Sequence, residues 1–306
     1  MKKYRIMKLN DIYNKEKTQI SYEVFPPKND TDGTKTSKLF DEILSLKKYK
    51  PALISVTYGA GGSNKEHSYE IVKYLSEKNL NVMPHFTCIC SSKTQIESYL
   101  NDLKTLNIEN ILALRGDEPK DNNICYLDFR YANELVEYLH LHTNFAIAVA
   151  GYPEGHLQAP DLNTDIKNLK KKLNAGGNVI FTQMFFDNDK FFKYKELLEK
   201  ENISNPVIAG ILPILSYEQL EKMLSLAKVT LPKKLMDTLE KYKYNKDDIK
   251  KIGIDFATEQ CQDLIDNKIK GIHFYTLNKS YSTSKILDNL NYATYISEQN
   301  STLEMK

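Results

Sequence analysis

Eight short apolar segments, each followed at once by a turn signal or a polar cluster, set the strongest limit on how this chain can fold. Segments of this length suit strands that are buried on both faces and are too short for ordinary helices. They occupy residues 20–25, 53–58, 82–89, 111–114, 145–150, 179–186, 207–214 and 272–277. Pro26 and Pro27 end the first segment, and Gly116 and Pro119 end the fourth, because these residue types interrupt strands.

The stretches between the apolar segments predict helices. They cover residues 36–49, 65–78, 93–106, 129–142, 161–174, 187–200 and 282–293, with Asp128 as an expected N-cap. Ser216 opens a further helix, and an extra helical segment follows at 231–267, before the last strand. Strands that alternate with helices indicate parallel pairing, because parallel strands need a crossover connection. The pattern therefore predicts an α/β fold, a (β/α)8 TIM barrel with an extra helical segment before the last strand.

A doubly wound open sheet would give the same alternation of strands and helices. That fold is expected to carry a glycine-rich turn after its first strand, whereas this chain has Pro-Pro-Lys-Asn-Asp there. The barrel is therefore favoured. We expect one catalytic domain over residues 1–306, in which residues 1–18 form an N-terminal extension and residues 295–306 a polar tail.

Composition excludes several classes of protein. Apolar residues make up 41% of the chain and charged residues 27%, which is typical of a soluble globular protein. The net charge of +2 gives no global field that would favour nucleic acid or an anionic membrane. The sequence has neither an apolar window of transmembrane length nor an apolar signal core at its N-terminus. We therefore predict a cytoplasmic protein without a nucleic-acid or membrane partner.

The four cysteines do not predict a metal site. Cys88 and Cys90 form the one close pair, and this spacing matches neither a common zinc site nor a redox Cys-x-x-Cys motif. On a strand, the two side chains would point to the same face. Small buried thiols in a reducing compartment are the simpler interpretation.

Polar residues follow nearly every predicted strand, where a barrel builds its active site. These candidates are Glu23, Thr57, His85, Asp117, Tyr152, Gln183 and Lys279. Glu23 shares a strand face with Ser21, and burial inside a barrel should raise its pKa and make it a general acid. An internal ion pair with a lysine or arginine is the alternative. Asp117 follows Gly116 in a loop, where we expect a solvated and ionised carboxylate.

Two further segments could bind a phosphate. Asp165, Asn168 and Lys172 share one face of the predicted helix at 161–174, beside Lys171. The lysines could neutralise a phosphate, or they could coat an ordinary solvated face. The turn at 59–62, Gly-Ala-Gly-Gly, could likewise cradle a phosphate or simply reverse the chain. Residue types alone leave both questions open.

Taken together, the strand-end segments resemble the methylenetetrahydrofolate reductase family, whose members depend on FAD. The matching segments are Tyr-Glu-Val-Phe-Pro-Pro at 22–27, Ser-Val-Thr-Tyr-Gly-Ala at 55–60, Pro-His-Phe-Thr-Cys at 84–88, Leu-Arg-Gly-Asp at 114–117, Gly-Tyr-Pro-Glu-Gly-His at 151–156, Phe-Thr-Gln-Met-Phe-Phe at 181–186, Gly-Ile-Leu-Pro-Ile at 210–214 and His-Phe-Tyr-Thr-Leu-Asn at 273–278. The length resembles the bacterial catalytic form, without room for the regulatory C-terminal domain of the eukaryotic enzymes.

The resemblance implies a reaction and the residues that perform it. FAD would pass hydride through flavin N5 from NADH or NADPH to 5,10-methylenetetrahydrofolate in a ping-pong scheme, giving 5-methyltetrahydrofolate for one-carbon metabolism and methionine biosynthesis. Glu23 matches the acid that assists opening of the folate ring to an iminium ion. Asp117 matches the carboxylate that stabilises this cation beside the flavin. The implied substrate-binding residues are Gln183, which reads the pterin edge, Gln219, Met223 and Lys279.

The resemblance also implies an FAD-binding set: Thr57, His85, Arg115, Gly116, Asp117, Tyr131, Ala132, Tyr152, His156, Ala159, Asp165, Asn168, Lys171 and Lys172. Arg115, Lys171 and Lys172 would neutralise the pyrophosphate, and Asp165 would bind a ribose hydroxyl. Lys171 and Lys279 stand where well-known bacterial members are expected to have arginine, which binds anions in a two-pronged fashion that lysine cannot match. Met223 stands where an aromatic residue is expected to stack on the substrate.

A homo-oligomer is expected, and two other functions remain as alternatives. The chain could be the flavoprotein subunit of a larger reductase that receives electrons from an accessory partner. It could instead be a barrel aldolase or lyase that uses Lys279 as a Schiff base. A loop lysine outside the apolar barrel has no obvious means of lowering its pKa, which disfavours the second alternative.

Overall fold

A computed structural model describes residues 6–58, 65–117, 127–227 and 229–295, and these residues form a closed barrel of eight parallel strands. The strands are β1 (Gln19–Val24), β2 (Leu53–Val56), β3 (Val82–Thr87), β4 (Asn110–Leu114), β5 (Ala146–Gly151), β6 (Val179–Met184), β7 (Val207–Ile211) and β8 (Gly271–Tyr275). Each strand pairs with its neighbours in sequence, and β8 closes the sheet on β1. The predicted (β/α)8 barrel is confirmed, and the open sheet is excluded.

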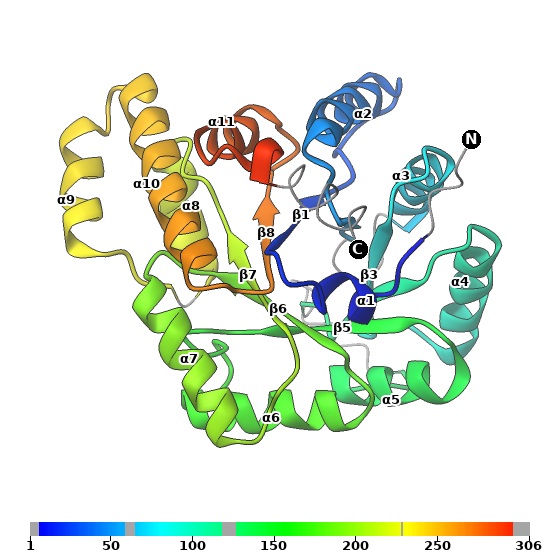
Figure 1. Ribbon diagram of the computed structural model, residues 1–306. Helices are drawn as coiled ribbons and strands as arrows, with labels where there is room; N and C mark the ends of the chain where they lie inside the picture. The colour runs from blue at the N-terminus through cyan, green and yellow to red at the C-terminus, as the bar shows by residue number, and fades with distance from the viewer. Residues whose placement is uncertain (1–5, 59–64, 118–126, 228, 296–306) are drawn as a thin grey trace, which may run out of the picture.

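Helices surround the barrel as a ring, with α9 and α10 standing beside α8 at one side (Figure 1). The helices are α1 (Leu9–Tyr13), which lies over the end of the barrel and not in the ring, α2 (Thr34–Leu46), the 3-10 helix η1 (Lys47–Tyr49), α3 (Lys65–Glu77), α4 (Lys93–Thr105), α5 (Ala132–His142), α6 (Leu162–Asn174), α7 (Asn188–Lys200), α8 (Tyr217–Leu226), α9 (Lys233–Tyr242), α10 (Lys246–Asp266) and α11 (Tyr281–Asn289). The extra helical segment before the last strand is therefore confirmed as α9 and α10.

Side-chain caps begin the two helices that carry most of the candidate residues beyond the strands. Asp161 accepts a hydrogen bond from Thr164 N at the start of α6, and Ser216 accepts one from Gln219 N at the start of α8. These bonds satisfy backbone N–H groups that the first turn of a helix leaves without a partner. The caps thus fix where both helices leave the ends of their strands.

Several strands end earlier than the apolar segments predicted. The first, second, third, sixth, seventh and eighth were expected to reach residues 25, 58, 89, 186, 214 and 277, but they stop at Val24, Val56, Thr87, Met184, Ile211 and Tyr275. The apolar residues beyond the strands serve other contacts. Phe186, Leu212 and Ile214, for example, pack in a separate cluster against residues of α8, α9 and α10. Apolar character therefore continues past the point where strand pairing stops.

The predicted helix start at Asp128 is wrong. Helix α5 begins at Ala132, and its first turn is closed by Glu134, whose carboxylate accepts hydrogen bonds from Arg130 N and Tyr131 N. Asp128 instead accepts a hydrogen bond from Lys93 N, at the first turn of α4. The acidic side chain does bond a helix N-terminus, but that of a neighbouring helix.

Cys88 and Cys90 do not lie on a strand, so the condition under which they would share a strand face is not met. Strand β3 ends at Thr87, and Cys90 lies in a turn with a φ of 56°. Cys88 and Cys261 are buried free thiols, and burial raises the pKa of Cys88 to about 12. Cys125, the glycine-rich turn at 59–62, Pro119 and the tail beyond Tyr295 lie outside the described residues.

The N-terminal extension contains a helix that the sequence pattern did not predict. Leu9, Ile12 and Tyr13 of α1 are buried and pack with the apolar residues of the barrel interior, including Phe181. Asn110, the first residue of β4, accepts a hydrogen bond from Leu9 N and donates one to Met7 O. Because β4 starts at Asn110, α1 closes the barrel at the amino-terminal ends of its strands.

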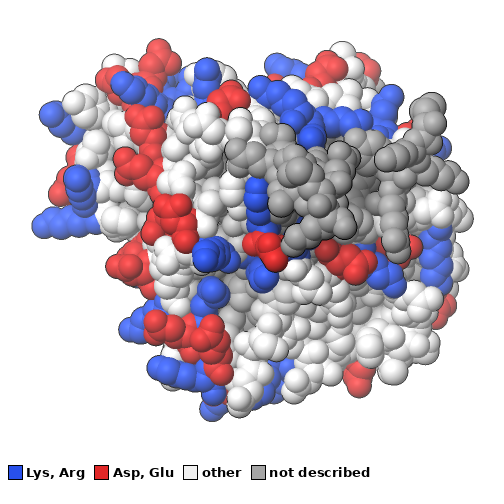
Figure 2. Space-filling view, in the orientation of Figure 1, with Lys and Arg blue, Asp and Glu red and all other residues white. Residues whose placement is uncertain are grey.

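The outer surface mixes both signs of charge. Basic and acidic side chains are interspersed over α7, α9 and α10 on the face shown in Figure 2. Among the helices of the described residues, none combines the length and the apolar character needed to cross a membrane.

We predict that Leu9→Ala will lower the free energy of unfolding by about 2–5 kcal/mol, the usual cost of truncating a buried leucine. Leu9 is fully buried at the closed end of the barrel, so the substitution leaves a cavity between α1 and the strands. Leu141→Ala is the control, because Leu141 is 70% exposed on α5 and should cost under about 0.5 kcal/mol. Urea denaturation measures both; equal losses would contradict a sealing role for α1.

Candidate active site

Three adjoining cavities cross the barrel at the carboxyl-terminal ends of its strands, and Arg115, Tyr152 and His156 line all three. Their volumes are about 470, 300 and 230 Å³. We call them the outer, middle and inner cavities: the outer one reaches α6, the middle one lies over β2 and β3, and the inner one lies beside Gln183 and Asp117. The shared residues make the three cavities one elongated groove at the end where barrel enzymes hold their substrates.

The residues predicted to bind the cofactor come together in this groove. The outer cavity is lined by Arg115, Tyr131, Ala132, Tyr152, His156, Ala159, Asp165, Asn168, Lys171 and Lys172. The middle cavity is lined by Thr57, His85, Arg115, Gly116, Asp117, Tyr152 and His156. Residues from four strand ends and from α6 thus share one continuous surface, as the positions of the sequence segments suggested.

The two lysines of α6 have different environments. Lys172 is partly buried, its Nζ donates to Ala150 O at 2.6 Å, and desolvation lowers its pKa to about 8, partly opposed by the charge of Asp165. Lys171 is exposed, and its Nζ lies 3.3 Å from Asn168 Oδ1. A solvated helix face describes Lys171 but not Lys172. The partly buried lysine is a cation less surrounded by water than Lys171, which suits it to an anionic ligand.

The middle cavity has a floor that only glycine can provide. Gly116 has a φ of 89°, and a Cβ there would lie 2.7 Å from Ile89 Cγ2 and 3.0 Å from Thr87 Cβ. The Thr87 hydroxyl beneath it is buried without a hydrogen-bond partner among the described residues. His85 Nε2 is likewise buried without a hydrogen-bond partner among the described residues, although a Glu23 oxygen lies 3.5 Å away. The cavity therefore offers a close backbone approach and two buried polar atoms that a ligand could satisfy.

Glu23 faces the barrel interior, as predicted, but its pKa is shifted in the direction opposite to the prediction. Burial raises the pKa, yet electrostatic attraction to the nearby His273 and His85 side chains outweighs it, so the pKa is lowered. The carboxylate lies 3.5 Å from His85 Nε2 and 3.9 Å from His273 Nε2. Among the described residues, the ion-pair partners of Glu23 are histidines, and not the lysine or arginine of the alternative prediction.

His273 was not singled out from the sequence, although it occupies the centre of the barrel interior. Its Nδ1 lies 2.8 Å from Ser21 Oγ, its Nε2 lies 3.3 Å from Ser55 Oγ, and the Tyr13 hydroxyl lies 3.3 Å from Ser21 Oγ. These bonds hold the ring of His273 beside Glu23. Two-residue alternation along the eighth strand could have identified it, since His273 shares a face with Tyr275.

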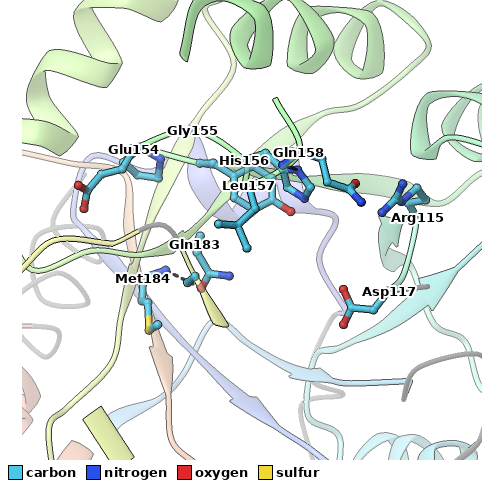
Figure 3. Close-up of a pocket in the computed structure, with 12 residues that line it drawn as sticks. Arg115, Asp117, Glu154, Gly155, His156, Leu157, Gln158, Gln183 and Met184 are labelled. Atoms are coloured by element: carbon cyan, nitrogen blue, oxygen red, sulfur yellow. Dashed lines mark hydrogen bonds between the residues drawn. The ribbon is translucent and has the colours of Figure 1, made fainter. Parts of the chain in front are cut away.

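Asp117 and Gln183 lie on opposite sides of the inner cavity (Figure 3). Asp117 is exposed, as expected for a loop carboxylate. Gln183 folds its side chain back, so that Met184 N donates to Gln183 Oε1 at 2.9 Å. The amide nitrogen consequently turns toward the side of the cavity where Asp117 lies (Figure 3).

Three predicted substrate residues do not line the described cavities. Gln219 and Met223 are partly buried on α8 one turn apart, and Met223 packs against the cluster beneath that helix. Lys279 is exposed in the loop after β8. Because Lys279 lies outside the apolar barrel, the structure gives the Schiff-base alternative no support.

Two other residues at this end of the barrel were not singled out from the sequence. Asn278 holds the ends of β1 and β8 together, accepting from Phe25 N and donating to Phe25 O. Glu154 lines the inner cavity and accepts hydrogen bonds from Lys190 and Thr230. No group of three or more histidine, cysteine, aspartate and glutamate side chains in the described part of the chain is placed to hold a metal ion.

A closed parallel barrel with a groove across its carboxyl-terminal mouth defines the class: a (β/α)8-barrel enzyme. The family model described as methylenetetrahydrofolate reductase matches residues 8–291. The chain belongs to the methylenetetrahydrofolate reductase family, whose named members are oxidoreductases that act on methylenetetrahydrofolate.

Individual relatives agree with this assignment. The chain is 37% identical over 280 residues to the 5,10-methylenetetrahydrofolate reductase of Buchnera aphidicola, covering 91% of this chain and 92% of that one. It is 33% identical to the Pectobacterium carotovorum enzyme, covering 85% and 86%. Methylenetetrahydrofolate reductase 1 of Schizosaccharomyces pombe is 35% identical over 90% of this chain, which spans 46% of that relative.

Among solved structures, an uncharacterized protein from Clostridium thermocellum that binds two copies of 5-methyl-5,6,7,8-tetrahydrofolic acid superposes with a TM-score of 0.63. It is 15% identical and the match covers 94% of this chain and 98% of that one. At this identity, the similarity shows the fold alone.

We predict that Gly116→Ala will destabilise the protein by more than Gly33→Ala. Both glycines have positive φ, but an added Cβ at Gly33 meets nothing within 4 Å, whereas at Gly116 it meets Ile89 and Thr87. The backbone penalty of about 1–2 kcal/mol should appear in both variants, and the steric clash only at Gly116. Urea denaturation of both variants measures the difference; equal losses would show that Gly116 is needed for its φ alone.

Proposed function

We propose that this enzyme binds FAD in the groove and reduces 5,10-methylenetetrahydrofolate to 5-methyltetrahydrofolate with electrons from a reduced nicotinamide, in a ping-pong scheme. The observation that carries the proposal is the continuous groove through Arg115, Tyr152 and His156, in a chain of the methylenetetrahydrofolate reductase family. When bound, the flavin would accept two electrons from the nicotinamide and release them to the folate methylene group.

The residues of the outer and middle cavities fit such a cofactor. Lys172 and Arg115 line the outer cavity and would neutralise the pyrophosphate, with exposed Lys171 at its edge. Asp165, which is 8% exposed, would accept a hydrogen bond from a ribose hydroxyl. The floor formed by Gly116 would let a ring system approach the backbone closely, with the hydroxyl of Thr87 and Nε2 of His85 available as polar partners.

The inner cavity would hold the reacting part of the folate. Exposed Asp117 would stabilise the cationic iminium electrostatically, and the Gln183 amide would hydrogen-bond the pterin edge. Gln219 and Met223 of α8 and Lys279 after β8 would bind parts of the substrate that extend outward, with Lys279 toward the glutamate tail. A lysine there would bind a carboxylate as a point charge.

Glu23 would protonate the leaving nitrogen of the folate ring. Its lowered pKa in the open site means that the carboxyl must gain a proton after the substrate binds. The side chain retains 20% exposure, and a ligand that covers it would increase the desolvation that raises its pKa.

NADH is our proposed electron donor, because a relative from Arabidopsis thaliana that is 34% identical carries NADH in its name. NADPH and an accessory electron-transfer partner are the alternative donors, and a homo-oligomer remains the expected state. Mixing the FAD-loaded protein with each nicotinamide under anaerobic conditions separates them. Bleaching of the flavin absorption band by NADH or NADPH identifies the donor, whereas bleaching by neither points to a partner.

We predict that the purified protein is yellow and releases FAD on denaturation. We also predict that Lys172→Met weakens FAD binding about ten- to hundredfold, the effect of a lost charged hydrogen bond. Lys172 has a pKa lowered to about 8, so it is charged below that pH. Affinity should therefore fall as pH rises through about 8. Fluorescence titration with FAD measures it, and a colourless protein that binds no added FAD would refute the proposal.

Lys171→Met is the matched control for this experiment. Lys171 is exposed on the same helix, so its loss should weaken binding less and leave the fall in affinity near pH 8 in place. Lys172→Met should abolish that fall. If the fall persists in Lys172→Met, another group is responsible for it.

We predict that Glu23→Gln will leave reduction of the flavin by the nicotinamide within about threefold of wild type, while folate reduction falls about a hundredfold or more, the contribution of a general acid. The amide keeps the shape of the side chain but cannot deliver a proton. Anaerobic stopped-flow spectroscopy measures the two half-reactions separately. Equal losses in both halves would count against an acid role and indicate a distorted site.

A further inference from the structure

Strand β6 carries an extra residue at the edge of the active site. Its pairing with β7 runs from Phe181↔Ile208 to Met184↔Gly210, so β6 advances three residues while β7 advances two. This β-bulge places Thr182 and Gln183 opposite one position of β7. Bulges commonly re-aim side chains beside active sites, and here two consecutive residues, Gln183 and Met184, both line the inner cavity.

Two hydrogen bonds hold the bulge. The Thr182 hydroxyl, in place of a main-chain carbonyl, accepts from Gly210 N at 2.9 Å. The Thr182 carbonyl accepts from the Tyr275 hydroxyl at 2.7 Å. Tyr275 lies on β8, which pairs with β7 and β1 and not with β6. Its side chain therefore reaches across β7 to bond the second strand along.

Gly210 leaves the space that this crossing needs. An added Cβ at Gly210 would lie 2.3 Å from Thr182 O and 2.9 Å from the Tyr275 ring. The ring thus packs where β7 has no side chain. Burial raises the pKa of Tyr275 well above its usual value, so its hydroxyl keeps its proton and remains a donor.

We infer that Tyr275 is a positioning residue for Gln183: its hydroxyl fixes the Thr182 carbonyl and so holds the bulge that presents the Gln183 amide to the substrate. The Gln183 side chain is held by its own neighbour, because Met184 N donates to Gln183 Oε1. The amide orientation therefore depends on the bulge geometry. This inference rests on the proposed function, since it takes the folate pterin to be what Gln183 contacts.

The test is a double-mutant cycle between Tyr275→Phe and Gln183→Ala, measured as kcat and KM for the folate substrate. Phenylalanine keeps the ring over Gly210 and removes the hydroxyl alone. We expect Tyr275→Phe to raise the folate KM roughly five- to tenfold, the effect of one net hydrogen bond. In the Gln183→Ala background the same substitution should change KM by less than about twofold, because the residue that it positions is gone. Equal effects in both backgrounds would show that Tyr275 acts without Gln183, which would overturn the inference.

Tyr292→Phe is the matched control. The Tyr292 hydroxyl also donates to a backbone carbonyl, that of Thr18, and this buried bond of 2.8 Å lies just before the first residue of β1, at the closed end of the barrel. Its loss should lower thermal stability about as much as Tyr275→Phe while leaving the folate KM unchanged. If Tyr275→Phe likewise lowers stability and leaves KM unchanged, its role is merely structural and the inference fails.

Hydrogen exchange reads the bulge without any substrate. Amides in the peptide 181–186 should exchange faster in Tyr275→Phe than in the wild type and stay unchanged in Tyr292→Phe; unchanged exchange in Tyr275→Phe would overturn the inference. A wild-type protein that exchanges as expected but does not reduce folate would instead refute the proposed function. The two failures are therefore distinguishable.

Discussion

Closure of eight parallel strands into a barrel requires its interior to be filled, and in this protein the two ends of that interior are filled in different ways. At the amino-terminal end, α1 inserts Leu9, Ile12 and Tyr13 into an apolar cluster with residues such as Met83 and Phe181. At the carboxyl-terminal end, the inward positions carry Glu23, His85 and His273. The sealed end excludes water from below, so polar groups at the open end interact in a less polar medium than bulk water.

The pKa of Glu23 depends on the polar groups that lie beside it at the open end of the barrel. A carboxyl group in a purely apolar interior would have a raised pKa, yet two imidazoles within 4 Å lower the pKa of this one. Ser21 and Ser55 contact both nitrogens of His273 and fix the ring beside the carboxylate. A series of side-chain contacts, from Tyr13 through Ser21 and His273 to Glu23, thus connects α1 with the active site. Tyr13 of α1 is hydrogen-bonded to Ser21, and Ser21 to His273, whose Nε2 lies 3.9 Å from the Glu23 carboxylate.

The sequence predicted the barrel well because strand burial and helix amphipathicity are local patterns. The predicted strand ends were wrong where an apolar residue after a strand packs outside the sheet. Phe186 and Leu212, for example, pack against residues of α8, α9 and α10 and do not belong to a strand. Helix α1 was not predicted because it has five residues, which are too few to show the periodicity of apolar residues along a helix. Asp128 shows a third limit, since a capping side chain can serve a helix distant in sequence.

The positions of the candidate site residues could be predicted from the sequence, but the burial and the neighbours of each side chain could not. Strand ends meet at one edge whatever the side chains are, so Thr57, His85, Asp117, Tyr152 and Gln183 were identified from their place after apolar runs. The family resemblance supplied most of the other residues that line the groove. The pKa of Glu23 depends instead on which residues of β3 and β8 face it, and that requires the barrel register. The difference between Lys171 and Lys172 likewise requires knowing that one of two adjacent helix positions faces Ala150.

The bulge in β6 shows how a property that no local pattern reveals can control a predicted residue. Regular alternation already places Gln183 on the inward face, so its assignment to the site did not need the bulge. What alternation does not predict is that the next residue, Met184, also lines the inner cavity and that its N donates to Gln183 Oε1. Tyr275 on β8 and Gly210 on β7 maintain the bulge. The orientation of one amide therefore depends on the relative positions of three strands, which the closed barrel holds constant.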